Sequence, residues 1–87
     1  IYKPTLYLLS IGISKYQNNF YNLQVADEDA KSISEIFKKQ ENKIYKKVVV
    51  KELLNDNATK DNILDALDWL EKESTQRDVA IIFIAGH

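Results

Sequence analysis

The feature that most constrains the fold is an uninterrupted apolar run, Val79–Ala85, in which hydrophobic side chains do not alternate with polar ones. Such a run is typical of a parallel strand that is covered on both faces. It is much shorter than the roughly 18 apolar residues that indicate a membrane-spanning helix. Because parallel strands need long crossover connections, which are usually helices, the chain is expected to form an α/β domain.

Two segments between the expected strands have the apolar spacing of helices that bury one face. The first stripe is expected to contain Ala26, Ala30, Ile33 and Phe37, with Ile36 beside them. The second is expected to contain Ile63, Leu67 and Leu70, with Leu64 and Trp69 beside them. Thr59 is a suitable N-cap for the second helix. We predict strands over residues 5–13, 44–53 and 79–84, and helices over residues 25–40 and 59–74.

Two right-handed crossovers between three parallel strands leave strand orders 2-1-3 and 3-2-1. We favour 2-1-3, because Lys46, Lys47 and Lys51 flank the second strand and such charges are typical of a sheet edge. The wholly apolar third strand then lies inside. In this order the chain reverses direction between the first and third strands, and sites in open α/β sheets form beyond the carboxyl ends of the strands at such a point.

The composition excludes several kinds of site. The 87 residues carry 12 Lys and Arg against 13 Asp and Glu, so charge gives no argument for binding nucleic acid or a membrane. There is no cysteine, and hence no disulfide or cysteine nucleophile within these residues. The single histidine and the helix-surface carboxylates lack the spacing of metal ligands. No signal peptide is visible, so we expect a cytoplasmic location, and the lack of any methionine favours a segment of a longer protein.

Three features fall at the expected carboxyl end of the sheet. His87, a natural general acid or base near neutral pH, follows the third strand through Gly86. Its alternative interpretation is a surface histidine at the end of the chain. The acidic run Asp27-Glu28-Asp29 either complements the dipole of a helix start or turns one carboxylate toward a cationic substrate group. The polar segment Ser14–Gln24 is longer than most strand–helix connections, which is typical of functional loops.

The segments YLLSIGISKYQ, LQVADEDAKSISEIF, NATKDNILDALDWL and DVAIIFIAGH, taken in order, resemble the first half of a caspase-like cysteine peptidase domain. The resemblance covers nearly the whole chain and is closest to metacaspases and their bacterial relatives. Its most specific part is the apolar strand that runs into Ala85-Gly86-His87, followed by Leu23–Ala30. It implies the three-layer α/β/α fold of the caspase–hemoglobinase class. Residues 1–87 would form the N-terminal part of one such domain, with part of its parallel sheet.

The resemblance implies a role for three residues. His87 would be the catalytic histidine of a Cys–His dyad. Asp29 falls where metacaspases place an acidic residue in the pocket for a P1 Arg or Lys. The backbone carbonyl of Tyr21, or of a neighbour, falls where the family orients the histidine. Leu23 stands where caspases carry the arginine that binds a P1 aspartate, which argues against cleavage after aspartate.

The implied activity is that of a thiol protease cleaving after Arg or Lys. Its nucleophilic cysteine would lie beyond this chain, so the fragment alone would be inactive. No cofactor is required, and calcium activation stays open through the resemblance alone. The implied partners are a peptide or protein substrate, the remainder of the domain C-terminal to His87, and fused or associated regulatory domains.

Two alternatives belong to other functional classes. A catalytically inactive caspase-like module that serves as a scaffold or regulator would share every feature above. A receiver- or flavodoxin-like binding domain would share the element order. It should, however, show an acidic cluster or a loop rich in Ser, Thr and Gly after its first strand, where this chain has Gly12-Ile13-Ser14 followed by an Asn- and Tyr-rich segment.

Overall fold

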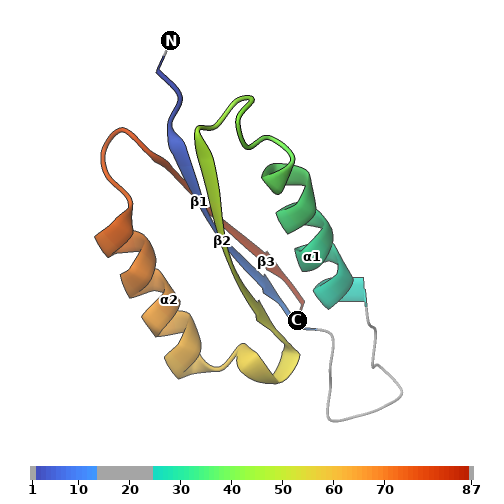
Figure 1. Ribbon diagram of the computed structural model, residues 1–87. Coiled ribbons are helices and arrows are strands. Elements are labelled where there is room, and N and C mark those ends of the chain that lie inside the picture. The colour runs from blue at the N-terminus through green and yellow to red at the C-terminus, as the bar shows by residue number, and fades with distance from the viewer. Residues whose placement is uncertain (1, 14–24, 87) are drawn as a thin grey trace.

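A computed structural model, which describes residues 2–13 and 25–86, shows three parallel strands between two helices (Figure 1). The strands are β1 (Thr5–Gly12), β2 (Lys47–Leu54) and β3 (Val79–Ala85). The helices are α1 (Val25–Lys38) and α2 (Lys60–Glu73), and a single 3-10 turn, η2 (Asn55–Asn57), precedes α2. The strand order is β2-β1-β3 with both pairings parallel, which confirms the α/β class and the 2-1-3 order. The third strand, which was expected to lie inside, is the second edge strand of the described sheet.

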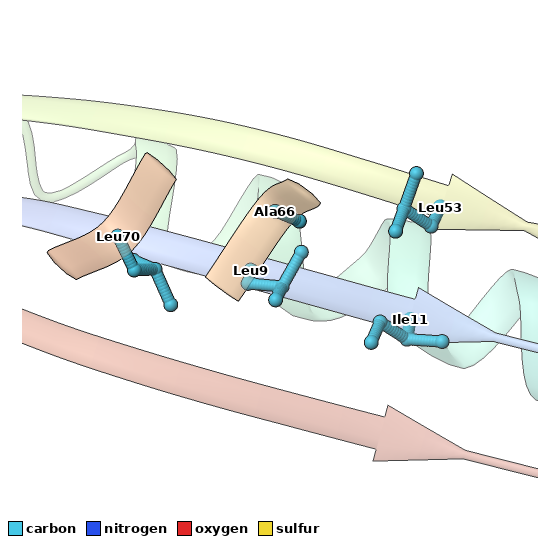
Figure 2. Packing of buried hydrophobic residues seen from close by; sticks show 5 residues of the cluster. All are labelled: Leu9, Ile11, Leu53, Ala66 and Leu70. Carbon is cyan, nitrogen blue, oxygen red and sulfur yellow. The ribbon is translucent and has the colours of Figure 1, made fainter. Parts of the chain in front are cut away.

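The central strand β1 supplies the largest share of the core and does so to both faces of the sheet. Its side chains alternate between the faces. On one face Leu9 and Ile11 pack with Ala66 and Leu70 of α2 and with β2 (Figure 2). On the other face the hydroxyl of Ser10 donates a hydrogen bond of 2.8 Å to a carbonyl oxygen in α1. The two helices therefore cover opposite faces, and the molecule has three layers.

The largest difference from the predicted boundaries is at the start of β2, which begins at Lys47 rather than at residue 44. The preceding residues close a turn in which Asn42 has a positive φ of 68° and its N–H donates to the carbonyl of Tyr45 at 2.7 Å. The other boundaries agree with prediction to within two residues. Thr59 is confirmed as the N-cap of α2, because its hydroxyl accepts from the N–H of Asn62 at 3.1 Å.

The predicted buried stripes are wrong at several positions. In α2 the small residue Ala66 is buried against the sheet together with Leu70, whereas Leu64 and Leu67 are exposed. In α1 Ile36 is also exposed, whereas Ser34, which the predicted stripe did not include, is buried. The physical reason is the placement of α2 over β1 and β2, which leaves the outer flank of that helix without a packing partner among the described residues.

The expectation that β3 is covered on both faces is also wrong for the described residues. Ile82 and Ile84 are 50% and 67% exposed, whereas their register partners Leu9 and Ile11 in β1 are buried. All four side chains lie on the face that α2 packs against. Figure 2 shows α2 above β1, to one side of β3. The residues of this apolar run that lie on the α2 face are therefore exposed, because α2 does not extend over β3.

Matched leucines on α2 test this packing. Replacement of Leu70, which is 6% exposed, by alanine should lower the free energy of unfolding by about 2–4 kcal/mol, because it removes buried methyl groups and leaves a cavity. The same replacement at Leu64, which is 52% exposed, should change it by less than about 1 kcal/mol. Urea titration of both variants gives the two values. Equal losses would contradict the placement of α2.

One carboxylate fastens the turn before β3 to the start of β1. The side chain of Asp78 accepts hydrogen bonds from the N–H and hydroxyl of Thr75, both at 2.9 Å, and from the N–H of Thr5 at 3.4 Å. These donors, the Thr75 N–H above all, favour the charged form and lower the pKa of Asp78. The ionised carboxylate is therefore the form that stabilises this turn.

The lowered pKa predicts how Asp78→Asn affects stability as a function of pH. The contribution of the carboxylate is fully present above the unfolded pKa of about 4 and is lost as pH falls through the lower folded pKa. The variant should melt at a lower temperature than the wild type at pH 7, and the gap should shrink below about pH 4. Asp68→Asn, an exposed carboxylate on α2, is the control. A gap that does not depend on pH would contradict this role for Asp78.

Candidate functional site

The carboxyl ends of the three strands and the amino end of α1 lie at the same end of the molecule (Figure 1). The strand order makes this end the point where successive connections leave in different directions, from β1 to α1 on one face and from β2 to α2 on the other. Sites in open α/β sheets form at such a point. The candidate site is therefore the region beyond the ends of β1 and β3.

At this end β1 and β3 stay paired to their last residues. Gly12 is the register partner of Ala85, and the N–H of Ile13 donates to the carbonyl of Ala85 at 3.0 Å. Ile13 and Ala85 thus lie side by side at the carboxyl end of the sheet. The residues that follow these two start from adjacent, hydrogen-bonded backbone positions.

Gly86 permits this close junction. Its φ of +136° is a backbone conformation that residues other than glycine rarely adopt. A Cβ at this position would also lie 2.6 Å from the carbonyl oxygen of Ile13, well inside van der Waals contact. Sequence reasoning assigned no role to Gly86, although a glycine directly between an apolar strand and a histidine was the available signal.

Asp29 is exposed on α1 and lies on the flank of that helix toward β3. The position of Lys38 shows which flank this is. The ammonium of Lys38 donates to the carbonyl of Val48 in β2 at 2.8 Å, so Lys38 lies on the β2 flank of the helix. Asp29 and Lys38 are nine residues apart, about two and a half turns, so they lie on opposite sides of the helix. Since β2 and β3 flank β1 on opposite sides, Asp29 lies on the same side of the sheet as the end of β3.

The turn of α1 that carries Asp29 is held against the sheet by its neighbour Ala30. The carbonyl oxygen of Ala30 accepts hydrogen bonds from the buried hydroxyls of Ser10 at 2.8 Å and Ser34 at 2.9 Å. Ser10 is fully buried in the central strand, so this bond fixes the position of the helix relative to β1. Sequence reasoning missed Ser10, although a serine inside an apolar strand is a signal for a buried polar contact.

The other two predicted site residues lie outside the described residues. His87 follows Gly86 directly, and Tyr21 belongs to the segment Ser14–Gln24, which continues from the end of β1. The structure therefore describes the residue that precedes His87, which is Gly86, and the residue that precedes the segment with Tyr21, which is Ile13. It does not describe the side chains of His87 and Tyr21. Ile13 and Gly86 lie close together, and the hydrogen bond from the Ile13 N–H to the Ala85 carbonyl holds them there.

Carboxylates with a lowered pKa lie at the opposite end of the sheet. Asp78 precedes β3, and Glu41, whose pKa is lowered chiefly by a hydrogen bond from the N–H of Val48, precedes the body of β2. Both act on backbone N–H groups and have a structural role. Within residues 2–13 and 25–86, no group of three or more His, Cys, Asp or Glu side chains could hold a metal ion. No helix in the same residues is both long and apolar enough to cross a bilayer.

Gly86→Ala tests the junction at the end of β3. The new Cβ should clash with the Ile13 carbonyl and force the backbone out of its φ, at a cost of about 1–3 kcal/mol of stability. Ala80→Ser, which enlarges an exposed residue of the same strand, should have little effect. Thermal unfolding compares the two variants. A Gly86→Ala variant as stable as the wild type would contradict the close approach.

Comparison with protein families finds one that describes this arrangement. The caspase domain family, a family of cysteine peptidases, matches residues 6–87, from β1 through the residue after Gly86. Comparison with curated proteins and with solved structures gives no significant match. The family match covers nearly the whole chain and agrees with the observed parallel sheet and strand order. The chain belongs to the caspase domain family.

Proposed function

We propose that the protein containing this domain is a cysteine endopeptidase that uses a Cys–His dyad and cleaves after Arg or Lys. The observation that carries the proposal is the junction at the end of β3. The single histidine of the chain, His87, follows Gly86, whose backbone packs against the end of β1 at the carboxyl end of the sheet. Membership of a family of cysteine peptidases supports a general base at this position.

His87 acts in this proposal as the general base and acid. Its imidazole stabilises the thiolate of a cysteine and then donates a proton to the leaving amine when the peptide bond breaks. In this proposal the nucleophilic cysteine lies outside residues 1–87, which contain no cysteine. Backbone N–H groups stabilise the tetrahedral oxyanion. The backbone carbonyl of Tyr21 accepts from the histidine ring and orients it.

Asp29 selects the substrate in this proposal. Its position on the β3 flank of α1, and the fastening of Ala30 to Ser10, support a carboxylate held close to the end of β3. A carboxylate binds a guanidinium or ammonium group through charge-assisted hydrogen bonds. Leu23 supplies no charge for a P1 aspartate, so basic P1 residues are preferred. The reaction needs no cofactor, and the substrate is a peptide or an unfolded segment of a protein.

Peptide hydrolysis by the full-length protein tests these roles, with fluorogenic substrates that carry Arg, Lys or Asp at P1. His87→Ala should abolish cleavage, because it removes the imidazole that the proposal uses as general base and acid. Asp29→Asn should lower kcat/KM for the Arg and Lys substrates about 10- to 100-fold, the loss of one charged contact in a site.

Glu28→Gln is the matched control, because Glu28 is an exposed carboxylate next to Asp29 on the same helix. It should leave kcat/KM within about twofold of the wild type. Circular dichroism of each variant separates loss of activity from loss of folding. Cleavage after Asp would retain His87 and contradict the role of Asp29. Absence of cleavage by a folded wild type, with and without calcium, would contradict the peptidase and favour an inactive scaffold.

A further inference from the structure

The outer edge of β2 offers backbone groups for pairing at one defined place. Among residues 2–13 and 25–86, β2 pairs with β1 on one side and with no strand on the other. At its start the edge is already occupied, because the N–H of Val48 donates to the carboxylate of Glu41 at 2.9 Å and its carbonyl accepts from the ammonium of Lys38 at 2.8 Å. These bonds show that the backbone groups of Val48 point away from β1.

The next backbone groups that point outward belong to Val50 and Glu52, because the direction alternates along a parallel strand. None of the described residues forms a hydrogen bond to them across this edge. Glu41 and Lys38 thus protect the first part of the edge from pairing and leave the second part open. An added strand has one register available, beside Val50 and Glu52.

A pocket of about 280 Å³ lies beside this open edge. Its walls are Ser34, Glu35 and Lys38 of α1 and Val50 and Glu52 of β2. The side chains of Val50 and Glu52 lie on the α1 face of the sheet, since their register partners are Leu8 and Ser10, and Ser10 bonds to α1. A side chain on the α1 face of an added strand would therefore enter this pocket.

The charges of the pocket select a cation. Lys38 is engaged with the Val48 carbonyl and lies 3.7 Å from the carboxylate of Glu41. Glu35 and Glu52 are exposed and make no ion pair with any described residue. Two carboxylates without a cationic partner among the described residues therefore line a pocket that the apolar side chain of Val50 also lines. A guanidinium or ammonium group on an aliphatic stem fits both properties.

We propose that the edge of β2 at Val50 and Glu52 binds an extended peptide segment of a partner protein, which adds a strand to the sheet and places an Arg or Lys side chain in this pocket. Main-chain hydrogen bonds give such strand addition its affinity, and the side-chain pocket gives its specificity. Two copies of the chain paired through β2 would bring the carboxylates of both pockets together, an unfavourable arrangement. This site is separate from the proposed catalytic site, which lies toward β3.

Binding is measured with the full-length protein carrying His87→Ala, so that a bound peptide is not cleaved. The probe is a short fluorescein-labelled peptide of alternating threonine and valine with one central arginine. Three comparisons are made: a peptide with glutamate in place of arginine, the arginine peptide with alternate amide nitrogens methylated, and the double variant Glu35→Gln/Glu52→Gln. The matched control is Glu28→Gln/Glu71→Gln, which removes the same charge from exposed positions elsewhere on α1 and α2.

The arginine peptide should bind and should shift the amide NMR signals of Val50 and Glu52. The glutamate and methylated peptides should not bind measurably, because one reverses the charge and the other lacks the ladder donors. The double variant should bind the arginine peptide about three- to tenfold more weakly, and the control double variant should bind as the parent does.

Four results would overturn the proposal. These are equal binding of the arginine and glutamate peptides, equal binding of the methylated peptide, and self-association of the protein through β2. The fourth is binding that is lost with Asp29→Asn and kept with Glu35→Gln/Glu52→Gln, which would place the peptide in the substrate site. Failure of strand addition would leave the peptidase proposal intact, since hydrolysis is measured separately.

Discussion

Burial of the central strand β1 on both faces is the constraint on which the rest of the structure depends. Leu8, Leu9 and Ser10 are fully buried in succession, so consecutive side chains need a covering layer on each side of the sheet. α2 supplies one layer through Ala66 and Leu70. α1 supplies the other and is fastened to Ser10 by a hydrogen bond rather than by apolar contact alone. A strand that is covered in this way must also be paired on both edges, which β2 and β3 provide.

This arrangement sets where chemistry can occur. Because β1 and β3 are paired in register to Ala85, and Gly86 packs against Ile13, the continuations of both strands leave from one place. The Ser10–Ala30 bond fixes the turn of α1 that carries Asp29 relative to the same strand. The opposite end of the sheet is occupied by backbone-binding carboxylates and has a structural role. The fold therefore fastens the amino end of the sheet through these carboxylates and brings Ile13 and Gly86 together at the carboxyl end.

Much of the fold could be predicted from the sequence, because apolar runs and helical spacing are local properties. The lysines around β2 correctly indicated an edge strand, and Thr59 correctly indicated a helix start. Helical spacing did not predict that Ala66 rather than Leu67 faces the sheet, since that depends on where α2 rests over β1 and β2. The exposure of Ile84 also depends on where α2 lies, because the sequence does not show that this helix covers β1 and β2 and leaves β3 uncovered.

The candidate site was predictable to a smaller extent. Its location followed from strand order, and the family match supports the segment around Gly86. The contacts that position it did not follow, because the Ile13–Gly86 approach and the Ser10–Ala30 bond join residues far apart in the sequence. Such contacts depend on the register between strands. An apolar pattern shows which face of the sheet each side chain lies on, but not which residues of two strands are paired.

The most direct test of the account is a crystal structure of the full-length protein bound to a peptide inhibitor that ends in a P1 arginine and reacts with a cysteine. The account predicts that the inhibitor lies beyond the carboxyl ends of β1 and β3, with the His87 imidazole within hydrogen-bonding distance of the cysteine sulfur and the Asp29 carboxylate on the guanidinium. An inhibitor bound elsewhere, or a His87 ring turned away from the cysteine, would contradict it.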